Sequence, residues 1–242
     1  MSQHSFPSFV RADNFSAALA FCSGIIADSN DVIVCDATAL KFVDPVGLCL
    51  LAATCHRLAS SGKKLKLENV PSAVAGYLSR MDLFKACGID YNEKFTRHDR
   101  RSDLVEICTA DKAADIDSLA SKITNALVGV TPDFDPKAQP DEMTGFISYD
   151  YLRIPLNYIF SELLENALTH GRRVGHKSAR AWIAAQYYPT KDRIRLAVVD
   201  DGCGFLASLR KHPELKQQNH SAAIRLALLP RKEDGVRSCI DT

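Results

Sequence analysis

The chain contains 242 residues, of which 46% are hydrophobic and 24% are charged. Its 30 Lys and Arg residues nearly balance its 29 Asp and Glu residues, which leaves a formal net charge of +1. This composition is typical of a globular protein, since disordered chains are less apolar and coiled coils are more charged. The balance also argues against general polyanion binding, so we expect no direct nucleic-acid partner. The length allows one large domain or two small ones.

The eight cysteines form no Cys-x-x-Cys pair and no Cys/His cluster at metal-ligand spacing. Several lie in apolar runs, as Cys49 does within 47–53, so we expect reduced thiols that pack as small hydrophobes. Residues 1–11 lack the basic start and apolar run of a signal peptide, and no apolar run reaches the roughly 20 residues of a membrane span. The sequence therefore predicts a cytoplasmic protein without a membrane partner.

The first patterned region extends to about residue 91. Its predicted elements are a strand at 31–35, a helix at 45–60, a strand at 63–70 and a helix at 72–86. Gly62 and Gly88 end the two helices. A strand, helix, strand, helix order at this pitch predicts a small α/β layer with a parallel pair of strands.

Residues 92–101 are charged and nearly free of apolar side chains, which predicts a linker between a domain over 1–91 and a domain over 102–242. The second region is expected to hold a strand at 103–108, a helix within 111–127, a helix at 151–170, strands at 178–188 and 193–199, and a short helix at 221–229. The turn at 189–192 fits a hairpin. The proline-rich, acidic segment 131–142 predicts a mobile loop. The expected fold class is therefore α/β, in two domains.

The loop before the first predicted helix reads Asp-Pro-Val-Gly at 44–47, within DATALKFVDPVGLCLLAA. By residue type this is a helix start, because Asp44 can cap backbone N–H groups and Pro45 suits the first helical position. Over 31–90 the segment resembles the STAS domain of bacterial anti-sigma-factor antagonists and sulfate-transporter tails. Phosphoswitch members of that family carry a Ser between this Asp and Gly, which a partner kinase phosphorylates. Pro45 and Val46 have no hydroxyl, so the resemblance implies docking of a partner, or of the neighbouring domain, without that switch.

The helix predicted at 151–170 carries a polar motif in the segment FSELLENALTHGR. Glu162 and Asn166 lie four residues apart, so both lie on one face, with His170 one turn further. An apolar stripe is expected at 159, 163 and 167 together with their neighbours 160, 164 and 168. Taken alone, a Glu–Asn pair at this spacing is usually a solvated helix face.

The strand predicted at 193–199 ends in the turn Asp200-Asp201-Gly202-Cys203-Gly204. Glycines at alternate positions permit unusual torsions and let a ligand approach the main chain, although a lone turn of this kind is ordinary. In combination the motifs are more specific: an ExxxN helix, two strands, and DxGxG beginning 34 residues beyond Asn166. Over about 103–205 this arrangement resembles the GHKL ATP-binding fold, a Bergerat-like α/β sandwich shared by histidine kinases, anti-sigma-factor kinases, Hsp90, DNA gyrase and MutL.

The GHKL resemblance implies a site for ATP and Mg²⁺. It assigns nucleotide-binding positions to Asn166, His170, Asp200, Gly202 and Gly204, the metal position to Asn166 and the catalytic position to Glu162. The Asn166 amide oxygen would coordinate Mg²⁺, and Glu162 would be the general base for attack on the γ-phosphate. Asp200 would accept from the adenine amino group. The His-Gly pair after the helix is most similar to the anti-sigma-factor kinase branch.

The family closes its site with a lid that ends in a third glycine-rich box, whose N–H groups contact the phosphates. After Gly204 this chain has a single glycine, Gly235, so the resemblance implies a domain that is incomplete beyond 205, with 221–229 as a candidate lid helix.

Two functions fit the paired resemblances. The first is an ATP-binding signalling regulator of the partner-switching type, acting as an ATPase or a serine/threonine protein kinase. It would have a regulatory protein partner in a sigma-factor or STAS-type pathway, or would act as a homodimer. The alternative is a non-catalytic interaction scaffold built from degenerate STAS and GHKL modules.

Overall fold

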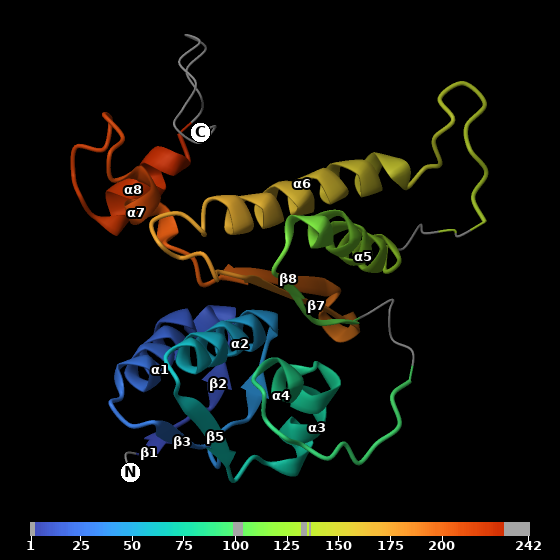
Figure 1. Cartoon of the computed structure of the whole chain (residues 1–242). Helices are drawn as coiled ribbons and strands as arrows, with labels where there is room; N and C mark the ends of the chain where they lie inside the picture. The colour runs from blue at the N-terminus through green and yellow to red at the C-terminus, as the bar shows by residue number, and fades with distance from the viewer. Residues whose placement is uncertain (1–2, 99–103, 132–134, 136, 230–242) are drawn as a thin grey trace.

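The computed structural model describes residues 3–98, 104–131, 135 and 137–229, and the structure is of the mixed α/β class (Figure 1). The strands are β1 (Gln3–Ser5), β2 (Phe9–Val10), β3 (Val32–Asp36), β4 (Phe42–Val43), β5 (Lys64–Glu68), β6 (Leu104–Ala110), β7 (Ala181–Tyr188) and β8 (Arg193–Asp200). The α-helices are α1 (Phe15–Ala27), α2 (Pro45–Ser60), α3 (Ser72–Arg80), α4 (Leu83–Ala86), α5 (Ile116–Val128), α6 (Asp150–Thr169), α7 (Gly204–Leu209) and α8 (His220–Ala227). Short 3-10 turns are η1 (Ala12–Asn14), η2 (Ala113–Asp115) and η3 (Pro189–Lys191).

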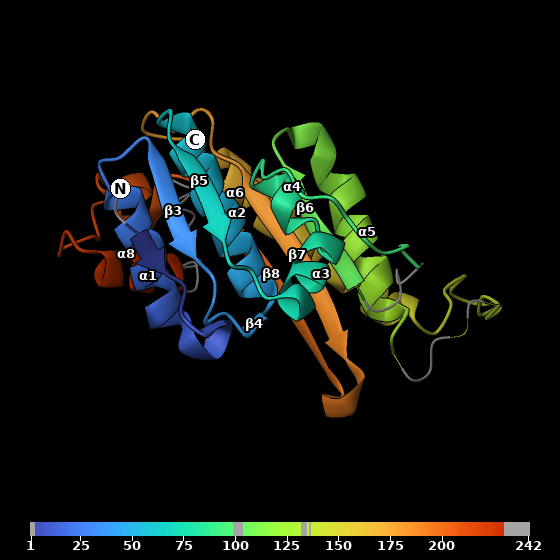
Figure 2. The ribbon, with the colours of Figure 1, turned by 90° about the horizontal axis from the view of Figure 1, so that it is seen from below.

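Residues 3–91, here called the N-terminal unit, contain a parallel sheet in the order β1-β3-β5, and Figure 2 shows β3 and β5 side by side. The parallel pair predicted from the sequence is confirmed, because β3 and β5 pair in register from Val32↔Lys64 to Asp36↔Glu68. A second, two-stranded parallel pair joins β2 to β4. The strands β1 and β2 and the helix α1 lie in the first 30 residues, for which the sequence pattern predicted no element.

Helix α2 has the predicted bounds, and local signals explain both ends. The Asp44 carboxylate accepts from Gly47 N at 3.0 Å, and Pro45 occupies the first turn. Gly62, at φ +76°, takes the left-handed conformation just beyond the helix. The prediction of one helix over 72–86 was wrong, because Asp82 has a left-handed φ of +60° and separates α3 from α4.

Residues 104–229, here called the C-terminal unit, form an antiparallel sheet in the order β6-β7-β8, with α5 and α6 on one face. The predicted hairpin is confirmed: β7 and β8 pair from Ala181↔Asp200 to Tyr188↔Arg193 around η3. The predicted apolar stripe of α6 was only partly right. Phe160, Leu164, Ala167 and Leu168 are buried, whereas Ile159 is 47% and Leu163 44% exposed. The sheet and α5 cover only one side of α6, so Ile159 and Leu163, on its other side, stay outside the core.

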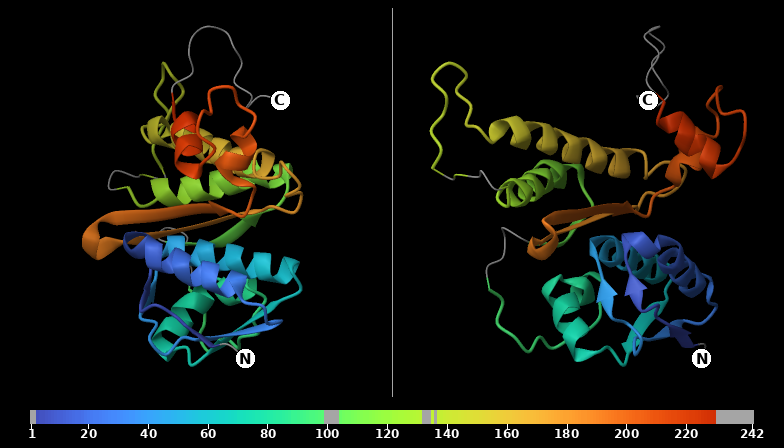
Figure 3. Two further views of the ribbon diagram at one scale, coloured as in Figure 1. Left: turned by 90° about the vertical axis from the view of Figure 1, so that its left-hand side faces the viewer. Right: turned by 180° about the vertical axis from the view of Figure 1, so that it is seen from behind.

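The opposite face of this sheet is covered by the N-terminal unit, as the side views show (Figure 3). Helix α2 packs on β7 and β8, and one apolar core runs through both units. Side chains of β7 therefore alternate between two buried surroundings: Trp182 and Ala184 belong to the core shared with α2, while Ile183 belongs to the core under α5 and α6. A strand covered on both faces is expected to be apolar throughout, as residues 181–185 are.

Polar side chains join the two units across this contact. These contacts include Asp44–Arg195, Asp13–Arg195, His56–Asp201, Tyr77–Gln186 and Arg80–Glu106. The Asp44 carboxylate is fully buried. It accepts hydrogen bonds from Arg195 Nη1 at 2.7 Å and from Ala12 N at 3.0 Å. The loop at 44–47 is thereby fixed against the sheet face that lies away from α5 and α6.

The described cysteines are free thiols. Burial raises the pKa of Cys22 to about 11 and that of Cys35 to about 12, so both stay protonated near neutrality and pack as apolar groups. Among the described helices, none has the combination of length and apolarity that a membrane span requires. Residues 99–101 of the predicted linker, 103 of a predicted strand, 132–134 and 136 of the predicted loop, and Gly235 lie outside the described ranges.

Candidate functional site

A pocket of about 330 Å³ lies between the C-terminal end of α6, the end of β8 and the helices α7 and α8. Four of the predicted site residues line it: Asn166, His170, Asp200 and Gly204. The pocket volume is at the lower end of the range of about 300–1,000 Å³ that is typical of small-molecule sites. Chain topology brings the two motifs together, because α6 crosses the sheet directly above the strand that ends at Asp200 (Figure 1).

The other two predicted residues lie elsewhere. Glu162 is exposed on α6, one turn before Asn166, and is not among the residues that line the pocket. Gly202 packs against the turn that follows α6: a Cβ atom there would lie 2.4 Å from Gly171 Cα. The reason for glycine at 202 is thus a close approach of two backbone segments, whereas Gly204 takes a left-handed φ of +72° at the start of α7.

The turn at 200–204 is held on its inner side by the end of α6. Cys203 N donates to Gly171 O at 2.9 Å, and Gly171 itself must be glycine because a Cβ atom would lie 2.1 Å from Ala167 O. Gly202 N donates to Asp200 Oδ1 at 2.9 Å, which leaves Oδ2 for another donor. The contact between the two turns fixes the distance between the α6 residues and Asp200.

Asp200 has an unusual electrostatic environment. Partial desolvation raises its pKa above the ordinary aspartate value, the neighbouring Asp201 adds to the rise, and the hydrogen bond from Gly202 N opposes it. Perturbed acids in concave sites are candidates for function. Asp200 can accept a hydrogen bond from a ligand when it is ionised and can donate one when it is protonated.

The remaining lining residues show what the pocket offers a ligand. Leu163, Val198 and Phe205 supply apolar surface, and Arg173 and Ser208 add a positive charge and a hydroxyl group. Sequence reasoning missed these five residues. Arg173 stands two residues beyond the His170-Gly171 pair, and this closeness to a motif residue was the sequence signal that could have identified it. The position of Phe205 depended on α7, which no sequence pattern predicted.

Asp201 is a second acid that sequence reasoning did not single out. Its Oδ1 accepts from Arg180 N at 2.8 Å, and its Oδ2 lies 2.7 Å from Nδ1 of His56, on α2. Both side chains are largely buried, with 17% of His56 and 12% of Asp201 exposed. The N-terminal unit therefore reaches the turn that carries Asp200.

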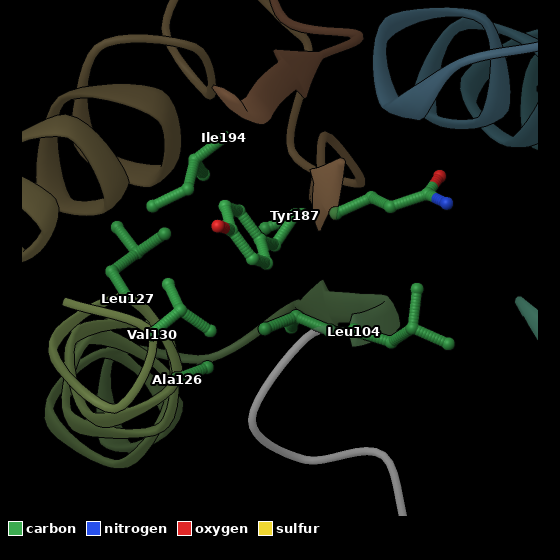
Figure 4. A pocket seen from close by; sticks show the side chains of 9 residues that line it. Leu104, Ala126, Leu127, Val130, Tyr187 and Ile194 are labelled. Carbon is green, nitrogen blue, oxygen red and sulfur yellow. The ribbon is translucent and has the colours of Figure 1, made fainter. Parts of the chain in front are cut away.

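Another cavity lies at the far end of the sheet, where the Tyr187 ring packs among Leu127, Val130 and Ile194 (Figure 4). Its volume is about 10 Å³, which is no larger than one water molecule requires, so it is a packing gap. In the part of the chain that the structure describes, no three His, Cys, Asp or Glu side chains converge as a metal-ion site. Comparison with protein-family models, with curated proteins and with solved structures gives no match to this chain.

Proposed function

We propose that this chain is an ATP-binding signalling regulator of the partner-switching type. In this proposal the N-terminal unit is a STAS-like domain and the C-terminal unit is a GHKL-type sandwich, and the pocket between α6 and β8 binds the nucleotide. The observation that carries the proposal is the meeting of Asn166, His170, Asp200 and Gly204 in one pocket. These residues come from two motifs that are distant in the sequence, the ExxxN helix and the DxGxG turn.

The chemistry of the pocket fits the base of an adenine nucleotide. Val198 and Phe205 offer apolar surface to a flat ring, and the ionised Asp200 carboxylate can accept from an exocyclic amino group. Partial desolvation at the pocket wall would strengthen such a hydrogen bond relative to one made in water. These groups support a ligand with a planar, amine-bearing ring.

The phosphate side of the proposed ligand involves α6. Asn166 is exposed at the pocket, where its amide oxygen is a suitable ligand for a Mg²⁺ ion that also binds phosphate oxygens and waters. Arg173 adds a positive charge to the same pocket. The metal would neutralise phosphate charge, and Glu162, exposed one turn away, would orient an attacking hydroxyl or water.

The N-terminal unit would have a docking role in this scheme. Its loop at 44–47 carries no hydroxyl at Pro45 or Val46, and its Asp44 is bound to Arg195 on the sheet face away from the pocket. A phosphate acceptor in this loop is therefore not proposed. Any phosphoryl transfer would go to water or to a separate protein partner.

Calorimetric titration with ATP, with and without Mg²⁺, tests the proposal. We expect saturable binding that Mg²⁺ strengthens in the wild-type protein, and an Asn166→Ala variant that binds ATP alone as well as wild type but gains nothing from Mg²⁺. The exposed Asn30→Ala variant, in the N-terminal unit, is the matched control and should retain the Mg²⁺ effect. An absence of binding in both conditions would reject the nucleotide site.

One observation favours the alternative, a non-catalytic interaction scaffold. Glu162, the proposed general base, does not line the pocket, so a bound nucleotide could serve as a structural ligand without turnover. The scaffold predicts partner binding that does not depend on ATP. Capture of a partner with equal yield by wild type and by Asp200→Asn, with and without ATP, would favour it over the switching regulator.

A further inference from the structure

We infer that His56, a residue of the N-terminal unit, is a positioning residue for the nucleotide pocket of the C-terminal unit, so that docking of α2 on the sheet and occupancy of the pocket are coupled. This inference rests on the proposed function, since the pocket must bind a nucleotide for the coupling to be expressed.

His56 and Asp201 form a direct contact between the two units. His56 Nδ1 lies 2.7 Å from Asp201 Oδ2, and the ring donates through Nδ1–H because a carboxylate can only accept. The ring also packs against Trp182, with centroids 5.3 Å apart, and this contact sets its orientation. With 17% and 12% of the side chains exposed, water can replace this hydrogen bond only if the groups move.

Asp201 is connected to the pocket through its neighbour in the chain, Asp200. Among the described residues, the Asp201 carboxylate has one other hydrogen-bond donor, Arg180 N at 2.8 Å, and the Asp201 backbone N donates to Arg180 O at 3.3 Å. Asp201 stands between Asp200, which lines the pocket, and Gly202, which packs on Gly171. The bonds of its carboxylate to His56 and Arg180 N, together with the backbone bond to Arg180 O, hold the Asp201 backbone in place, and any shift of that backbone would also move Asp200, its direct neighbour.

Loss of the His56 contact would have an energetic cost at Asp201. Without the His56 donor, the largely buried Asp201 carboxylate keeps Arg180 N as its one hydrogen-bond donor within the described part of the chain. A poorly solvated charge that has lost a donor favours movement toward water. Small displacements of a recognition group weaken binding substantially. Coupling between sites is reciprocal, so a nucleotide that fixes Asp200 would also stabilise the docked position of α2. A protein that binds the N-terminal unit and shifts α2 would lower the affinity for nucleotide.

The test compares ATP affinity in two variants by calorimetry. His56→Phe keeps a ring against Trp182 but removes the hydrogen bond, and His56→Asn restores a donor near the position of Nδ1. The matched control is Tyr77→Phe, which removes a different contact between the units, from Tyr77 Oη to Gln186 Oε1 at 2.9 Å, away from the pocket. We expect His56→Phe to weaken binding about fivefold or more, His56→Asn to recover most of it, and Tyr77→Phe to bind as wild type.

A second measurement uses the wild-type chain and does not depend on how the variants fold. Saturating ATP should slow amide hydrogen exchange in the last two turns of α2, around His56, more than in α3. Equal ATP affinities of wild type and His56→Phe, equal losses in His56→Phe and Tyr77→Phe, or unchanged exchange in α2 would each overturn the coupling. If wild type binds ATP in these tests, the proposed function stands even though the coupling falls. If it binds none, both fall.

Discussion

The ion pair between Asp44 and Arg195 makes a sharp prediction about how the two units are held together. Asp44 is fully buried and belongs to the N-terminal unit, while Arg195 reaches it from β8 and is 19% exposed. We consider Arg195→Met, which keeps an apolar stem of similar length and removes the charge. The Asp44 carboxylate would then remain in the interior without its cationic partner.

The expected magnitude follows from the partners that remain. Removing one member of a buried ion pair destabilises a protein by about 3–5 kcal/mol. Asp44 would still accept from Gly47 N and Ala12 N, both at 3.0 Å, so the lower end applies and we expect a loss of about 3 kcal/mol. The second contact of Arg195, with Asp13, involves an exposed carboxylate and adds little. For a chain of this size, such a loss lowers Tm by about 6–12 °C.

The assay is urea unfolding followed by the fluorescence of Trp182, the single tryptophan, which is buried in the core between the units. Arg193→Met is the matched control, because Arg193 lies on the same strand and is exposed, so its replacement should change stability by less than about 0.5 kcal/mol. If Arg195→Met is as stable as the control, the buried ion pair does not hold the two units together.

Two further predictions concern the turn at the end of β8. Gly202→Ala should destabilise the chain by about 1–3 kcal/mol, since the added Cβ would lie 2.4 Å from the backbone of Gly171. Gly76→Ala is the control: it has open space in α3 and should stabilise the chain by about 0.5–1 kcal/mol. Equal effects of the two substitutions on thermal unfolding would contradict the close approach at Gly202. The raised pKa of Asp200 should make ATP affinity fall on acidification at a pH above the ordinary aspartate range, because only the ionised carboxylate accepts from the base. Because the pKa of Asp200 is higher in the folded than in the unfolded chain, protonation of Asp200 favours the folded state. This stabilisation is complete below the unfolded-state pKa and is lost as pH rises through the folded-state pKa. In Asp200→Asn, the part of the pH dependence of ATP affinity that comes from Asp200 should disappear, and the part that comes from titration of ATP itself should remain. If the pH profile of ATP affinity is the same in Asp200→Asn and in wild type, Asp200 does not bind the base.

Local sequence signals predicted the elements that local chemistry determines. The Asp44 cap, Pro45 in the first turn and Gly62 beyond the end specify α2. The short turn at 189–192, followed by alternating charged and apolar residues at the start of β8, specifies the β7–β8 hairpin. Helix α1 was missed because its sequence, FSAALAFCSGIIA, has no clear polar face. The break between α3 and α4 depends on a single left-handed residue, Asp82, in a segment whose apolar spacing continues.

The long-range contacts could not be predicted in the same way. His56 and Asp201 are 145 positions apart, and Asp44 and Arg195 are 151 apart, so no sequence spacing relates them. An indirect signal was present in the uninterrupted apolar run at 181–185, which indicates a strand covered on both faces. For the pocket, the two motifs identified Asn166 and Asp200, whereas the packing of Gly202 on Gly171 required the fold.

Calorimetric titration of ATP into wild type and Asp200→Asn at neutral pH tests whether the pocket between α6 and β8 binds an adenine nucleotide through Asp200. The variant keeps the size of the side chain and removes its charge, so a hydrogen bond to a charged group is weakened. With Asp31→Asn, an exposed residue of the N-terminal unit, as the control, we expect Asp200→Asn alone to weaken binding about tenfold or more. Equal affinities for wild type and Asp200→Asn, or no binding by wild type, would contradict the claim.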